Sequence, residues 1–108
     1  MVLVNFPHNP TGYTPSREEF GKLVDVVRAS GAILFSDEMY RFMDVDPSSA
    51  CPSAVELYDR AVSLGGLSKS HSCPGLRCVH AHVWHARTPP TGQHLTGHFT
   101  HRAGAAGW

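Results

Sequence analysis

One amphipathic helix between two short apolar segments constrains the fold more than any other feature of the chain. Its apolar stripe recurs at helical spacing and consists of Phe20, Leu23, Val24 and Val27. Ser16 and Glu19 have the spacing of a capping box, although Thr14 followed by Pro15 offers a competing start. Gly31 is a typical helix stop. We therefore expect a helix that begins near Ser16 and ends before Gly31.

The segments on either side of this helix have the composition of buried strands. Residues 2–4 and 32–36 are short apolar runs, and residues 61–64 form a third. Residues 53–58 predict a short helix, whereas residues 41–52, rich in proline and acidic side chains, predict a loop. Strand, helix and strand in this order favour a right-handed βαβ unit with a parallel sheet. The sequence thus predicts an α/β fold.

Each predicted strand runs directly into a polar cluster. The clusters are residues 5–12, 37–40 and 68–77. In an open parallel sheet, ligands bind in the crevice beyond the carboxyl ends of the strands. We therefore expect the three clusters to face one site.

Lys69 lies in the third cluster among small and glycine residues, with Arg77 a short distance on. An amine that forms a Schiff base must be approached closely by a flat carbonyl compound, and small neighbours permit that approach. Arginine offers a planar fork suited to a phosphate group. Taken alone, however, this stretch would be interpreted as a glycine-rich turn beside a surface lysine.

Three short motifs in the clusters occur together in a known order. Asn9-Pro-Thr-Gly12, Asp37-x-x-Tyr40 and Ser68-Lys69 with Arg77 resemble the signature of fold-type I, class I/II pyridoxal-phosphate (PLP) enzymes, the aspartate aminotransferase family. The resemblance covers residues 1–77. It implies a fragment of the three-layer α/β/α large domain of a PLP-dependent transferase, with a mainly parallel sheet.

The resemblance also implies a role for each matching residue. Lys69 would be the catalytic residue, holding PLP as a Schiff base and moving the proton between the substrate α-carbon and the cofactor. Asp37 would pair with the pyridine nitrogen and keep it protonated, so that the ring acts as an electron sink.

The remaining matches would complete the cofactor site. Tyr40 and Asn9 would donate hydrogen bonds to the phenolic oxygen of the ring, and Ser68 and Arg77 would hold the phosphate. The resemblance makes the Asn9–Pro10 peptide bond a candidate cis bond. Gly66 departs from the family, which often has a serine three residues before the lysine.

The function implied is amino transfer from an amino acid to a 2-oxo acid. The motif determines the cofactor and not the bond that is broken, so a PLP-dependent lyase or decarboxylase is an alternative. A non-catalytic fragment or pseudoenzyme is another, because intact family members are several times longer and complete the site with further elements. We accordingly expect an incomplete chain that is marginally folded when isolated and binds PLP weakly or not at all.

Composition bears on partners and localisation. The formal net charge of zero offers no electrostatic argument for nucleic acid or an anionic membrane, and the apolar runs are too short to cross a bilayer. Three cysteines without metal-ligand spacing fit a reducing, cytoplasmic setting. The resemblance implies a homodimer for the intact protein.

The chain changes character after Arg77. All nine acidic residues lie at or before Asp59, and six of the eight histidines follow Arg77. We therefore divide the chain into a partial PLP-binding large domain, residues 1–77, and a tail outside the family pattern, residues 78–108. The composition of this tail is typical of irregular sequence or of translation in a shifted reading frame. Its His80-x-His82-x-x-His85 spacing has no cysteine or carboxylate partner, so we predict no metal site.

Overall fold

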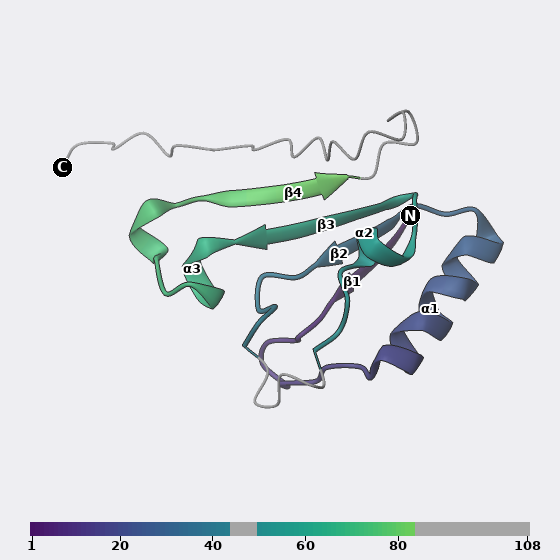
Figure 1. The fold of residues 1–108 in the computed structure, drawn as a ribbon, viewed down its shortest axis with the longest axis horizontal. Helices are drawn as coiled ribbons and strands as arrows, with labels where there is room; N and C mark the ends of the chain where they lie inside the picture. Colours follow the sequence, from purple (N-terminus) through teal and green to yellow (C-terminus); the bar gives the residue numbers. More distant parts are fainter. Residues whose placement is uncertain (44–49, 84–108) are drawn as a thin grey trace.

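A computed structural model describes residues 1–43 and 50–83 and shows a four-stranded sheet with short helical segments (Figure 1). The strands are β1 (Val2–Asn5), β2 (Leu34–Asp37), β3 (Ala61–Gly66) and β4 (Val79–Val83). The helical segments are α1 (Arg17–Ser30), α2 (Ala54–Leu57), α3 (Leu67–Ser70) and the 3₁₀ turn η2 (Pro74–Leu76). The sheet order is β1-β2-β3-β4; β1, β2 and β3 are parallel, and β4 is antiparallel to β3. The predicted α/β fold with a mainly parallel sheet is confirmed.

Helix α1 forms where the local sequence predicts it, and its N-terminus settles the choice between two starts. Ser16 is the N-cap: its hydroxyl accepts a hydrogen bond from the backbone N–H of Glu19 at 3.2 Å. The Glu19 carboxylate accepts from the Ser16 backbone N–H at 2.8 Å, which completes the capping box. The helix ends at Ser30 and is capped by Gly31, whose φ of 67° lies in the left-handed region that favours glycine.

Helices α1 and α2 cover one face of the sheet. Alternate strand residues point to opposite faces, and the buried set on this face packs against the helices in a single core. That core consists of Val4, Phe20, Val24, Val27, Leu34, Ala54, Tyr58 and Ala61. The Tyr58 hydroxyl donates to the Ala32 carbonyl oxygen at 2.8 Å and joins the end of α2 to the segment before β2.

The opposite face carries a row of apolar side chains across all four strands. Register places Leu3, Phe35, Val62 and Val83 side by side in this row. Leu3 is 64% exposed and Val83 is 47% exposed. Among the residues that the structure describes, no helix contributes core residues to this face of the sheet. None of the described helices is long and apolar enough to span a membrane.

The sequence did not predict strand β4. It lies in the segment after Arg77, which was expected to be irregular, and it makes the sheet mixed. Strand β4 forms because residues 79–83 pair with β3 from Val62 to Gly66. Only the part of the predicted tail from residue 78 to residue 83 lies within the described residues.

Candidate functional site

Tyr40 and Asn9 meet at the carboxyl edge of the sheet. Asn9 lies in the loop after β1, and its Nδ2 donates a hydrogen bond to Tyr40 Oη at 3.0 Å. The Asn9–Pro10 bond is cis, as predicted, and the Phe6–Pro7 bond is cis as well. The loop is closed by a hydrogen bond from the Gly12 N–H to the His8 carbonyl oxygen at 2.7 Å. Two predicted site residues, far apart in sequence, are therefore in direct contact.

Lys69 joins this pair from the third strand. It lies in α3, which follows β3 without a break, and its side chain is exposed. Lys69 Nζ lies 5.8 Å from the centroid of the Tyr40 ring, within the range of a cation–π contact. An amine, a phenol and an amide thus converge at one edge of the sheet.

Asp37 ends β2, between Asn5 of β1 and Leu64 of β3. Its Oδ1 accepts a hydrogen bond from the Met39 backbone N–H at 3.1 Å, which stabilises the turn that carries Tyr40. The neighbouring Asn5 Oδ1 is buried and has no hydrogen-bond partner among the residues that the structure describes. Two side-chain acceptors, one of them unsatisfied, therefore lie side by side at the strand ends.

Ser68 and Arg77 lie on segments that are hydrogen-bonded to each other. Ser68 is half-buried beside Lys69, and Arg77 is exposed at the end of η2 with a φ of 49°. The Leu67 N–H donates to the Cys78 carbonyl oxygen at 3.2 Å, which holds the end of η2 against the start of α3. Within residues 1–43 and 50–83, no hydrogen bond links Arg77 to Ser68 or Lys69.

The chemistry of this donor set fits PLP. An amine, a carboxylate, a phenol, an amide, a hydroxyl and a guanidinium are the groups that an aldehyde-bearing pyridine ring with a phosphate can use. The residues concerned are Lys69, Asp37, Tyr40, Asn9, Ser68 and Arg77. The buried Asn5 Oδ1 beside Asp37, which lacks a hydrogen-bond partner among the described residues, also favours a site that binds another molecule. The individual roles of these residues stay predictions.

The structure explains the departure at Gly66. A Cβ built on Gly66 would lie 2.8 Å from Met39 Cε and 3.2 Å from the Cys78 carbonyl oxygen. Met39 therefore occupies the space that a serine side chain would need. The turn between Asp37 and Tyr40 is packed directly against the residue that precedes α3.

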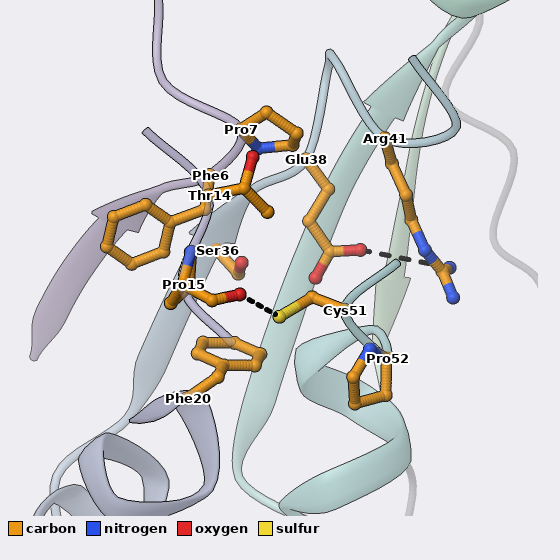
Figure 2. A pocket seen from close by; sticks show the side chains of 10 residues that line it. All are labelled: Phe6, Pro7, Thr14, Pro15, Phe20, Ser36, Glu38, Arg41, Cys51 and Pro52. Atoms are coloured by element: carbon orange, nitrogen blue, oxygen red, sulfur yellow. Dashed lines mark hydrogen bonds and ion pairs between the residues drawn. The ribbon is translucent and has the colours of Figure 1, made fainter. Parts of the chain in front are cut away.

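A cavity of about 20 Å³ lies away from these residues, beside α1 and the loop after β1 (Figure 2). It is lined by Phe6, Pro7, Thr14, Pro15, Phe20, Ser36, Glu38, Arg41, Cys51 and Pro52. Its volume suits one water molecule and is far too small for a cofactor. None of the six predicted site residues lines it, so we do not regard it as the functional site. Nor do the described residues contain a group of three or more His, Cys, Asp or Glu side chains that could hold a metal ion.

Glu38, a buried carboxylate next to the predicted site residue Asp37, was not predicted from the sequence to be part of the site. It follows Asp37, yet its carboxylate is directed to the helix-covered side of the sheet, where it is 9% exposed. The signal was present in the sequence: two adjacent residues at a strand end point to opposite faces, so one of the two carboxylates had to face the core.

The fold and the site define a class of protein: an α/β chain with a lysine-centred site at the carboxyl ends of parallel strands. The family described as aminotransferase class I and II matches residues 1–85, eight residues beyond the predicted boundary at Arg77. The chain belongs to this family.

Individual relatives agree with this assignment. The chain is 35% identical over 81 residues to an aspartate aminotransferase of Thermococcus kodakarensis, which covers 75% of this chain and 21% of the relative. It is 41% identical over 77 residues to capreomycidine synthase of Streptomyces vinaceus, covering 71% of this chain and 20% of the relative. A solved PLP-dependent aminotransferase from Streptococcus suis superposes with a TM-score of 0.69 at 34% identity, covering 77% of this chain and 21% of that one. The chain spans about a fifth of the length of these relatives.

Proposed function

We propose that this chain contributes the cofactor-bearing lysine of a PLP-dependent aminotransferase that moves an amino group from an amino acid to a 2-oxo acid. The observation that carries the proposal is the convergence of Lys69, Tyr40 and Asn9 at one sheet edge in a chain of this family. When bound, PLP supplies an electron sink that stabilises negative charge at the substrate α-carbon.

The residues of the chain would each do one task. The Lys69 amine would attach the cofactor and then, once free, carry a proton to and from the substrate α-carbon. Asp37 would keep a proton on the ring nitrogen, while Tyr40, oriented by Asn9, would donate to the ring oxygen. Ser68 and Arg77 would hold the phosphate.

The intact protein would work as a cytoplasmic homodimer. The homodimer is what the family resemblance implies, and a reducing, cytoplasmic setting suits an odd number of cysteines without metal-ligand spacing.

A second candidate is a PLP enzyme that catalyses a different reaction. Capreomycidine synthase is 41% identical over this segment, although its name does not describe an aminotransferase. The segment is therefore compatible with more than one reaction, because it carries the cofactor residues and not the rest of the substrate site. Formation of pyridoxamine phosphate from PLP and an amino acid would favour amino transfer, whereas a cleaved amino acid with unchanged PLP would favour a lyase or decarboxylase.

The cofactor assignment can be tested on the chain itself because its two lysines are Lys22 and Lys69. Lys22 is exposed on α1 and paired with Glu18 at 2.7 Å, so it serves as an internal control. The chain would be titrated with PLP and reduced with borohydride, and each lysine would be quantified by peptide mass spectrometry. We expect labelling of Lys69 at lower PLP concentration than Lys22, and loss of that preferential label in Lys69→Ala but not in Lys22→Ala. This outcome would also overturn the expectation from the sequence that the isolated chain binds PLP weakly or not at all. Equal labelling of the two lysines at every concentration would refute the proposal.

A further inference from the structure

The Glu38 carboxylate is the centre of a buried hydrogen-bond network beneath the site. It accepts hydrogen bonds from Ser53 Oγ at 2.7 Å, from Ser63 Oγ at 2.9 Å and from the Ala54 backbone N–H at 2.8 Å. Arg41 Nη1 lies 3.9 Å away, as the dashed line in Figure 2 marks. These partners come from β3, from the start of α2 and from the turn after β2. One carboxylate therefore joins three elements of the fold.

The main chain of Glu38 holds the same turn. Its N–H donates to the Leu64 carbonyl oxygen at 2.7 Å, which extends the pairing of β2 with β3 by one residue. Its carbonyl oxygen accepts from the Arg41 N–H at 2.9 Å, and the Tyr40 carbonyl oxygen accepts from the Met43 N–H at 3.2 Å. The path of residues 37–43 is thus fixed at Glu38 from both the backbone and the side chain.

The side chains that flank Glu38 in this turn reach the candidate site. Asp37 points to the face opposite the Glu38 carboxylate, Met39 packs against Gly66, and Tyr40 contacts Asn9 and Lys69. A change in the direction of the turn would therefore displace the Asp37 carboxylate and the Tyr40 phenol together. Both are assigned to the cofactor under the proposed function.

We infer that Glu38 is a positioning residue, which sets the place of Asp37 and Tyr40 by anchoring the turn between them to the core. The inference rests on the proposed function for the identity of the ligand. An apolar residue would fill the same volume without the cost of burying a charge, and burial of an ionic group is a poor route to stability. Satisfied polar networks instead favour a single arrangement of the chain, because every alternative leaves buried groups unpaired.

The test compares Glu38→Ala with Glu38→Gln. Alanine removes the acceptor and leaves Ser53, Ser63 and the Ala54 N–H without their common partner. Glutamine keeps the shape, and serine hydroxyls both donate and accept, so the network can re-form around the amide. Val24→Ala is the matched control: Val24 is 1% exposed in α1, and its truncation lowers stability without touching the turn.

The readout is amide hydrogen exchange of the full chain without cofactor, measured by NMR for Arg41 and Met43 relative to amides of α1. We expect Glu38→Ala to accelerate the turn amides by about tenfold over the α1 amides, as local loss of hydrogen bonds would. Glu38→Gln should stay within about threefold of the original chain on the same scale. In Val24→Ala the ratio should not change. The Tyr40 ring resonances should shift in Glu38→Ala alone.

Two results would overturn the inference. The first is equal acceleration of turn and helix amides in Glu38→Ala, which would make Glu38 a general stability residue. The second is a glutamine variant that behaves as the alanine variant does. Labelling of Lys69 in the original chain decides the proposed function separately. If Lys69 is labelled in preference to Lys22 but Glu38→Ala leaves the ratio of turn to α1 exchange rates unchanged, only the inference about Glu38 is rejected. If the two lysines are labelled equally but Glu38→Ala raises that ratio, only the proposed function is rejected.

Discussion

Replacing Gly66 by alanine tests whether the turn after β2 and the lysine segment are packed as one unit. The φ of Gly66 is −169°, extended backbone that any residue adopts, so an added methyl group meets contacts and not backbone strain. The new Cβ would lie 2.8 Å from Met39 Cε, 3.0 Å from Met39 Sδ and 3.2 Å from the Cys78 carbonyl oxygen. Three atoms must therefore give way.

The size of the effect follows from which atoms can move. Overpacking a well-packed site costs about 1–3 kcal/mol. The nearest atoms belong to the end of a flexible methionine, while the carbonyl oxygen needs a shift of only a few tenths of an ångström. We therefore expect a loss near the lower end, about 1–2 kcal/mol in the free energy of unfolding. Met39→Ala removes the two closest atoms, so the double variant should recover about 1 kcal/mol relative to additivity.

Urea unfolding followed by far-UV circular dichroism gives the four free energies of this double-mutant cycle. A Lys69 labelling titration on the same variants shows whether the site moves with the packing, since Met39 lies between Asp37 and Tyr40. We expect weaker labelling in Gly66→Ala and partial recovery in the double variant. Additive free energies, or a Gly66→Ala chain as stable as the original, would refute the account of this contact.

Three further predictions use other parts of the fold. Gly65→Ala should cost no more than Gly66→Ala, because the atoms nearest to its Cβ all belong to the His80 imidazole, the end of a side chain that can turn away, and His80→Ala should remove the cost in urea unfolding. Ser16→Ala should cost about 1 kcal/mol by the same measurement, since it removes the N-cap of α1. The hydrogen bonds from the Ser16 backbone N–H and hydroxyl lower the pKa of Glu19, so the stabilisation from this carboxylate is full above the unfolded pKa of glutamate and is lost as the pH falls through the folded value. Ser16→Ala removes the hydroxyl bond and keeps the backbone bond, so it should make that acid limb shallower. The exposed apolar row should make the chain self-associate as its concentration rises, which sedimentation velocity measures, and Leu3→Lys should reduce that association because Leu3 is 64% exposed in the row. Association that Leu3→Lys leaves unchanged would argue against the row as its cause.

Local features were predictable from the sequence. The capping box of α1, its glycine stop and its apolar stripe are determined by residues within one or two helical turns, and the structure reproduces them. Strand β2 begins at Leu34 and not at residue 32 as predicted, because the Tyr58 hydroxyl binds the Ala32 carbonyl oxygen before the sheet begins. Such an end effect depends on a residue far along the chain.

Strand β4 was missed for a related reason. His80 and His82 alternate with Val79, Ala81 and Val83, a weakly apolar pattern that does not predict a strand by itself. The strand exists through its antiparallel pairing with β3, which is a contact between segments and not a local preference. His80 then covers Gly65, where a side chain would leave no room for its ring.

The pair Asp37–Glu38 shows how far strand alternation can be used to find a site. Once the residues before Asp37 are assigned to a strand that ends at the carboxyl edge of the sheet, alternation requires either Asp37 or Glu38 to face the helices. The sequence also offers serines on β3 and at the start of α2 that could satisfy a buried acceptor, and Ser63 and Ser53 do so. What the sequence could not supply is the register that brings Ser63 level with Ser36, two residues before Glu38. Residues that face a ligand can be found from motifs, whereas residues that hold them in place become visible only when strand register is known.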